Sequence, residues 1–153
     1  MDVPLPDASM DAVISQEAFL HVPDLARVLA EAYRILKPGG RLAYTNWVAE
    51  QPLSPADAEL MWQGMAVAPL SSFEAQRDLL RRAGFTVLSV EDLSREWGVI
   101  LEQRLAMYQK LRGEAEQAGT PAGHDAFDRS YVRFVDLMQT GGLCGGRFTA
   151  ERS

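Results

Sequence analysis

The sequence has few of the residues that disulfides and metal sites require. It contains one cysteine, Cys144, and two histidines, His21 and His124, in 153 residues. A single cysteine cannot form an internal disulfide, and two widely separated histidines match no zinc-binding spacing. Cys144 is most simply interpreted as a small buried apolar side chain. We therefore expect no metal centre.

Long apolar runs and blocks of basic residues are also missing. No stretch approaches the roughly 18 to 20 apolar residues that span a bilayer, and the first residues do not form a signal peptide, which predicts a cytoplasmic protein. The formal net charge of -6 disfavours binding to a phosphate backbone. We expect a small organic molecule or a protein as partner, with no nucleic acid and no membrane.

With 47% hydrophobic residues, the chain can build one core, and we interpret residues 1–153 as a single domain. A short apolar run at 11–16 predicts a buried strand, helical spacing of apolar residues predicts a helix over 23–36, and 41–47 reads as a second strand. Between the helix and the second strand, Lys37-Pro38-Gly39-Gly40 predicts a turn with Gly39 at positive φ. This order predicts a right-handed crossover between parallel strands.

The rest of the chain alternates further helices and strands. A capping box from Ser71 to Glu74 predicts a helix that ends at Gly84. The remaining pattern predicts a helix at 55–65, a strand at 85–90, a helix at 97–111, a loop at 113–123, a helix at 125–138 and a short strand at 147–150. We interpret 48–70 and 95–140 as helical insertions.

Three motifs, in order and at a specific spacing, resemble a known family. They are LPDASMDAVISQ at 5–16, HVPD at 21–24 and LKPGGRL at 36–42. They resemble the region from just before the fourth strand to the fifth strand of class I S-adenosylmethionine-dependent methyltransferases. Residues 16–21 and 141–152 look most like the branch that methylates small molecules, including sarcosine and dimethylglycine methyltransferases and natural-product sugar methyltransferases.

The resemblance implies an α/β fold: a partial Rossmann-like sheet with helices on both faces. The family strand order is 3-2-1-4-5-7-6, and the strands here would be the fourth, fifth, seventh and sixth. The strand at 147–150 would then lie antiparallel between those at 41–47 and 85–90. The first three family strands and the glycine-rich cofactor turn are not found, and the sequence contains no G-x-G. A fragment, a misplaced start codon or one half of a split enzyme would each give this sequence.

The resemblance also implies where the cofactor, S-adenosyl-L-methionine, would lie. Ser15, Gln16 and Glu17 match positions beside its methionine part, at the carboxyl end of a strand, where α/β sheets bind ligands. The alternative is a solvated strand exit. His21 matches a histidine that borders the acceptor in some relatives and would serve as the catalytic base. Its alternative is a histidine packed near a helix start that donates to a backbone group.

On the acceptor side, the resemblance implies a pocket that the helical insertions cover. Asn46 stands where several relatives have Asp. Because an amide cannot act as a base, either the amine of the acceptor loses its proton unaided, or the acceptor is oriented rather than activated by Asn46. The substrate-binding candidates are Asn46, Trp47, Trp62 and Tyr108, with Met65, Trp97 and Tyr131 as further lining. For each aromatic residue, an ordinary core position is the alternative interpretation.

The implied reaction is methyl transfer to a small-molecule amine or hydroxyl in the complete enzyme. The sulfonium is already reactive, so the protein mainly aligns the nucleophile with the methyl group and excludes water. We expect these 153 residues to be inactive alone, and to self-associate or to need a missing N-terminal half. A non-enzymatic interaction module and one half of a split methyltransferase stay open. An α/β hydrolase is disfavoured, because the sequence has no G-x-S-x-G.

Overall fold

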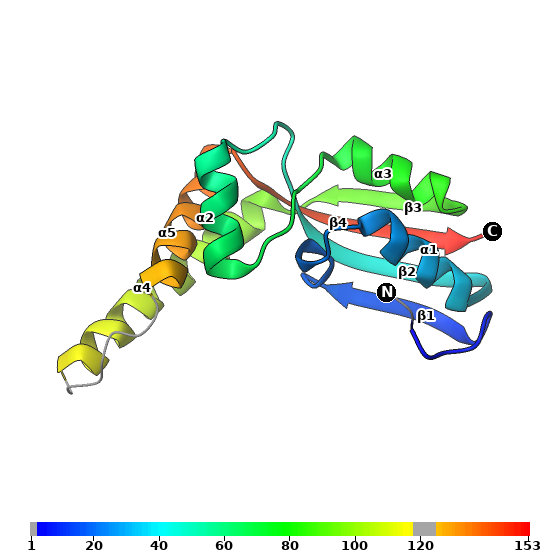
Figure 1. Cartoon of the computed structure of the whole chain (residues 1–153), viewed down its shortest axis with the longest axis horizontal. Helices are drawn as coiled ribbons and strands as arrows, with labels where there is room; N and C mark the ends of the chain where they lie inside the picture. Colours follow the sequence, from blue (N-terminus) through cyan, green and yellow to red (C-terminus); the bar gives the residue numbers. More distant parts are fainter. Residues whose placement is uncertain (1–2, 118–124) are drawn as a thin grey trace.

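The structure is a computed structural model that describes residues 3–117 and 125–153. Figure 1 shows a sheet at one end of the molecule and a group of helices at the other. The elements, in chain order, are β1 (Met10–Gln16), the short 3-10 helix η1 (Phe19–His21), α1 (Leu25–Ile35), β2 (Leu36–Val48), α2 (Pro55–Met65), α3 (Phe73–Arg82), β3 (Phe85–Asp92), α4 (Ser94–Gln117), α5 (Asp125–Thr140) and β4 (Cys144–Arg152).

The four strands form one mixed sheet in the order β1-β2-β4-β3. β1 and β2 are parallel, with Val13 opposite Leu42. β4 runs antiparallel to both of its neighbours, and Phe148 lies opposite Tyr44 on one side and Val90 on the other. The predicted crossover and the predicted place of the last strand are both confirmed.

The turn after α1 is part of a strand. Gly39 has φ +76°, as predicted, but β2 already begins at Leu36 rather than at Arg41. Leu36 lies opposite Met10, and the next pair is Arg41 with Ala12, so the residues between them form an irregularity in β2. β1 and β2 pair on both sides of residues 37–40. These four residues therefore bulge out of the ladder, and the sheet continues beyond them.

One face of the sheet is covered by α1 and α3. Asp24 caps α1 by accepting from the Arg27 N–H (3.0 Å), which agrees with the predicted start of this helix. Leu29 of α1 and Leu80 of α3 are fully buried in one cluster with Tyr44 of β2. Burial of this apolar face holds the two helices on the sheet.

Helices cover the opposite face only at the carboxyl ends of the parallel strands. There α5 packs on Trp47, whose ring stacks on Phe134, and α4 brings Trp97 against Gly145 of β4. Helices therefore touch both faces, as expected. Toward the other end of this face no helix of the described chain covers the sheet, and Ile14 of β1 is 81% exposed.

Other predicted boundaries also differ from the structure, including the start of α4 at Ser94 rather than 97 and of β4 at Cys144 rather than 147. α3 is capped by Ser72, whose Oγ accepts from the Ala75 N–H (3.1 Å), and not by Ser71. α4 continues to Gln117, so the first part of the predicted loop at 113–123 is helical, and its residues 118–123 lie outside the described residues. A glycine inside a helix costs only about 1 kcal/mol, and α4 continues through Gly113.

In the described parts of the chain, no helix is both long enough and apolar enough to cross a membrane.

Candidate functional site

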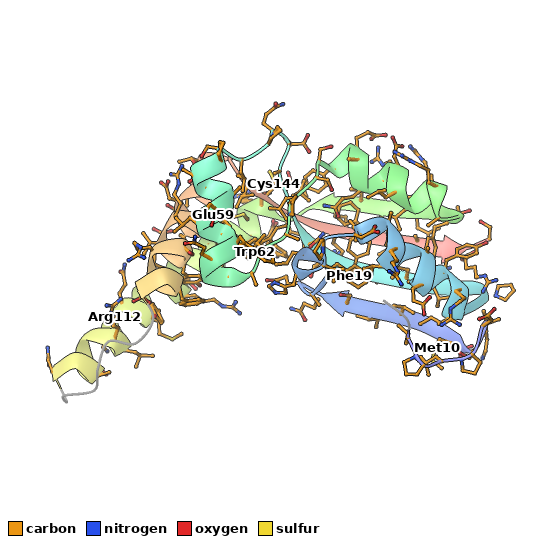
Figure 2. The ribbon with its side chains drawn as sticks, viewed as in Figure 1. Met10, Phe19, Glu59, Trp62, Arg112 and Cys144 are labelled. Carbon is orange, nitrogen blue, oxygen red and sulfur yellow. The ribbon has the colours of Figure 1, made fainter. Side chains whose placement is uncertain are left out.

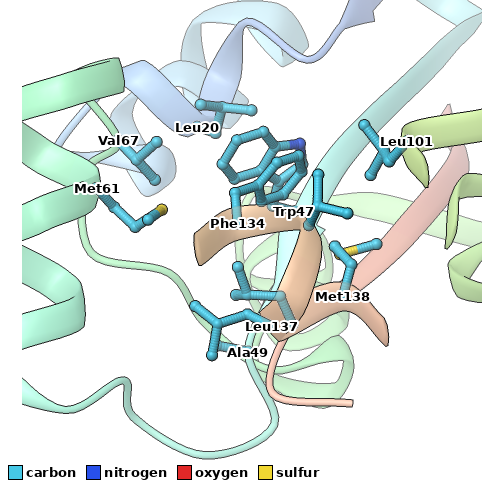
Figure 3. Close-up of a cluster of buried hydrophobic side chains, with 11 residues drawn as sticks. Leu20, Trp47, Ala49, Met61, Val67, Leu101, Phe134, Leu137 and Met138 are labelled. Atoms are coloured by element: carbon cyan, nitrogen blue, oxygen red, sulfur yellow. The ribbon is translucent and has the colours of Figure 1, made fainter. Parts of the chain in front are cut away.

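A second apolar cluster joins the sheet to the three helices α2, α4 and α5 at the carboxyl ends of β1 and β2. At its centre, the rings of Trp47 and Phe134 are parallel within 13° with centroids 3.8 Å apart (Figure 3). Leu20 of η1 and Met61 of α2 close the cluster from the other side. In open α/β sheets, ligands bind outside this end of the parallel strands.

An open hollow of about 480 Å³ lies beside this cluster, and we call it the His21 hollow. It is lined by Glu17, Leu20, His21, Trp47, Gln63, Gly64, Met65, Ala66 and Phe127. Three of the predicted site residues, Glu17, His21 and Trp47, therefore meet in one place, together with Met65. The size is that of a small-molecule site.

His21 ends η1, and its Nδ1 lies 3.1 Å from the carbonyl oxygen of Ala66. A carbonyl can only accept, so we assign the proton to Nδ1, which donates to Ala66. In the neutral ring, Nε2 is then the nitrogen that can take up a proton. His21 therefore makes the hydrogen bond to a backbone group that one of its two interpretations predicted. This bond leaves Nε2 free of it, so it is compatible with the other interpretation, a catalytic base.

The end of β1 turns sharply into this hollow. Glu17 has φ +49°, and its N–H donates to the Thr45 carbonyl (3.1 Å), which makes the last bond between the two parallel strands. Its side chain lines the hollow. Gln16 is exposed one residue earlier, and the hydroxyl of Ser15 is buried. Of the three predicted cofactor residues, only Glu17 lines the His21 hollow.

Several buried polar atoms at this end of the sheet have no hydrogen-bond partner among the described residues. They are Ser15 Oγ, Thr45 Oγ1, Asn46 Oδ1 and Trp47 Nε1. Buried polar atoms are nearly always bonded, and each unpaired one costs on the order of 1 to 3 kcal/mol. Four of them on two adjacent strand ends indicate that these ends are built to meet something more than the described chain.

Asn46 points away from the His21 hollow. It is 3% exposed, and its Nδ2 donates to Gln76 Oε1 of α3 (3.3 Å), which also accepts from the Tyr44 hydroxyl (3.4 Å). The Gln76 amide nitrogen donates to the Trp47 carbonyl (3.3 Å). Burial raises the pKa of the Tyr44 phenol. Gln76 thus ties the end of β2 to α3, a role that no sequence pattern had marked.

The other predicted acceptor residues lie outside the hollow. Trp62 is 52% exposed on α2 and lines a separate depression, while Trp97 packs against Gly145. Tyr108 donates to the Asp128 carboxylate between α4 and α5, and its ring meets that of Phe127 at 6.0 Å. The Tyr131 ring stacks on Phe127 (5.6 Å) and also meets the Tyr108 ring (6.1 Å), and partial burial raises the pKa of the Tyr131 phenol. Tyr108 and Tyr131 therefore support the lining residue Phe127.

Sequence reasoning missed part of the lining. Ala66 has φ +53° and caps the end of α2 in the left-handed conformation. This conformation is uncommon for alanine, so the sequence does not predict it. Gln63 and Gly64 belong to a helix whose bounds were predicted but whose polar face was not considered. Phe127 lies within the helix predicted at 125–138, and its place at the hollow depends on how α5 docks.

The comparisons with known proteins agree with this geometry. A family described as "Methyltransferase domain" matches residues 1–44, which include β1, η1, α1 and the start of β2. The chain is 32% identical over 145 residues to a dimethylglycine N-methyltransferase of Parasynechococcus marenigrum, an alignment that covers 94% of this chain and 51% of that protein. The chain spans about half or less of the length of the curated relatives that it matches.

Solved structures show the same fold. A protein of Galdieria sulphuraria, assigned as a sarcosine dimethylglycine methyltransferase, superposes with a TM-score of 0.83 at 24% identity, over 99% of this chain and 56% of that one. A Haemonchus contortus phosphoethanolamine N-methyltransferase in complex with S-adenosyl-L-methionine gives a TM-score of 0.75 at 21% identity, over 97% of this chain and 34% of that one. The chain is thus similar in sequence to part of several small-molecule methyltransferases, and it has the fold of the corresponding part of the solved methyltransferase structures.

Proposed function

We propose that this chain is the acceptor-side half of an enzyme that transfers a methyl group from S-adenosylmethionine to a small-molecule amine or hydroxyl. The observation that carries the proposal is the His21 hollow, which lies at the strand ends that hold the four unpaired buried polar atoms. A site poised for a ligand at the carboxyl ends of parallel strands is what a Rossmann-like enzyme needs.

The cofactor would be held from this side by the end of β1. Ser15 has a buried hydroxyl without a partner in the described chain, and Glu17 lines the hollow, so both fit the polar methionine part. Gln16 is exposed beside them. When bound, the cofactor supplies an electrophilic methyl on a positively charged sulfur. The sequence offers no glycine-rich turn for the adenosine part, so we propose that the isolated chain binds the cofactor weakly and is inactive alone.

The acceptor would lie in the His21 hollow. His21 Nε2 would receive the proton of the nucleophile, and the buried Trp47 ring with Met65 would exclude water. Asn46 would act indirectly, by fixing the end of β2 through Gln76. Within the insertions at 48–70 and 95–140, α2 and α5 supply the far wall of this hollow, and Tyr108 supports it from behind.

A polypeptide would complete the sheet beside β1. Within the described residues β1 pairs with β2 alone. Residues 3–9 do not cover its free edge, since they lie along the end of α1, where Arg34 donates to the carbonyls of Val3 (3.0 Å) and Leu5 (2.9 Å). An N-terminal half in trans or a second copy of this chain would use that edge.

The test is a chimera that joins the amino-terminal half of the Parasynechococcus dimethylglycine N-methyltransferase to residues 1–153. We expect calorimetry to detect S-adenosylhomocysteine binding by the chimera and none at micromolar concentration by the isolated chain. The chimera should form S-adenosylhomocysteine with some members of a panel of small amines and alcohols. A folded chimera that binds no cofactor would contradict the proposal.

His21→Ala in the chimera should lower turnover about 100-fold or more while cofactor affinity is kept, because general base catalysis contributes on this scale. His124→Ala is the matched control and should leave turnover unchanged. A chimera that binds the cofactor but methylates nothing would favour the alternative, a non-enzymatic interaction module.

A further inference from the structure

A second hollow, which we call the Trp62 hollow, lies on α2 and the segment that follows it. Its volume is about 360 Å³. It is lined by Ala49, Pro52, Leu53, Ala58, Glu59, Met61, Trp62, Val67, Ala68, Pro69 and Leu70. No residue lines both this hollow and the His21 hollow. It is therefore a separate site, which the proposed methyl transfer does not use.

The walls are almost entirely apolar, and two of the lining residues on α2, Trp62 and Glu59, stand out from the small and aliphatic side chains around them. Trp62 is 52% exposed, which is unusual for the largest aromatic side chain. Glu59 precedes it by three residues, so the two side chains lie on the same face of α2, where Figure 2 labels both. Among the described residues that line the hollow, Glu59 alone carries a charge.

Nothing in the described chain neutralises that carboxylate. Glu59 is exposed, no ion pair that includes it is found among the described residues, and its carboxylate accepts one hydrogen bond, from the Gln63 side chain on its own helix. An anion would be repelled by Glu59, and a neutral apolar ligand would remove water from an uncompensated charge. A cation with an apolar surface satisfies both features, because it attracts the carboxylate and the face of an indole ring.

We propose that the Trp62 hollow binds a small organic ammonium ion, with the charged nitrogen between Glu59 and the Trp62 ring and the alkyl groups against the apolar wall. The volume lies at the lower end of ligand pockets, which fits a molecule of a few carbon atoms.

The test uses the whole chain without any methyl donor, so it does not depend on the proposed function. Choline and its neutral isostere 3,3-dimethyl-1-butanol are titrated while the indole N–H signals of the three tryptophans are followed by NMR. We expect choline to saturate in the millimolar range, to move the signal of Trp62 and not that of buried Trp47, and to bind about fivefold more tightly than the isostere.

The variants assign the effect. Glu59→Gln keeps the shape and should weaken choline about threefold or more, and Trp62→Leu should remove most binding. Glu96→Gln removes the same charge from an exposed position of α4 and should have no effect. Equal binding of choline and its isostere, equal weakening by Glu59→Gln and Glu96→Gln, or no saturation by about 50 mM would each overturn the proposal. Circular dichroism checks that every variant is folded.

Discussion

Among the described glycines, Gly145 has the closest neighbour to the place where a Cβ atom would stand. A Cβ atom there would overlap the ring of Trp97, whereas one at Gly98, inside α4, would meet nothing within 4 Å. We expect Gly145→Ala to lower the free energy of unfolding by about 1 to 3 kcal/mol, because the ring must move. Gly98→Ala should raise it by about 0.5 to 1 kcal/mol, since alanine favours the helix.

Urea denaturation of both variants measures the two effects. Because both replacements add one methyl group to a glycine, opposite signs isolate the contact with Trp97. A neutral Gly145→Ala would show that α4 docks differently at its start.

Gln76 is a second residue whose side chain we expect to contribute strongly to the stability of the fold. It is 1% exposed and bonds two side chains and two backbone carbonyls, of Trp47 and Ser71. We expect Gln76→Leu to cost about 2 to 3 kcal/mol, since it leaves buried partners unpaired. Gln51→Leu, at an exposed loop position, is the control and should change the urea midpoint little. Similar midpoints for both variants would contradict the importance of this polar group.

At the scale of elements, an ion pair joins α2 to α5. The Arg133 guanidinium donates to both carboxylate oxygens of Asp57 (2.7 and 3.1 Å), and these hydrogen bonds hold the pKa of Asp57 below its usual range. Because the pKa of Asp57 is lowered in the folded state, its carboxylate stabilises the folded protein at pH values above the ordinary pKa of Asp. This stabilisation is lost as the pH falls through the lowered pKa.

Asp57→Asn should therefore reduce stability at pH 7, and its deficit relative to the parent chain should shrink as the pH falls below about 4. Urea midpoints at pH 7 and near pH 3 measure this difference. Glu96→Gln serves as the exposed carboxylate control. A deficit that is constant with pH would mean that Asp57 acts through its shape rather than its charge.

The elements themselves were largely predictable, because their signals are local. Pro55–Met65 was predicted with its observed bounds, and Asp24 was correctly placed at the start of α1. Adjacent Ser71 and Ser72 offer the same capping chemistry, so the sequence alone favoured the wrong one. Which tryptophan faces the His21 hollow depends on how α2 and α5 dock on the sheet. For this reason, the spacing of apolar residues could not predict that Trp47 lines the His21 hollow and Trp62 does not.

At the scale of the whole molecule, the outer edge of β1 and part of one face of the sheet are open. Ile14 is 81% exposed on β1, at the strand whose outer edge has no partner in the described chain. An apolar edge strand is a template for association. We expect the isolated chain to self-associate at tens of micromolar in sedimentation equilibrium.

Ile14→Lys should shift that equilibrium toward monomer by at least tenfold in the dissociation constant, because a buried charge is costly at an interface. Val132→Lys, at a similarly apolar exposed position of α5, should leave the dissociation constant unchanged. A cooperatively folded monomer at these concentrations would refute association through β1.

The place of β4 bears on how the chain is made. β4 lies between β2 and β3, and it follows every other described element in sequence. During synthesis, β2 and β3 therefore leave the ribosome before the strand that joins them, and neither can pair with the other in its native place. Until Cys144–Arg152 emerges, the nascent chain carries two open strand edges, the kind of surface that chaperones shield. Completion of the sheet is thus the last step of biosynthesis for this region, whatever folds before it.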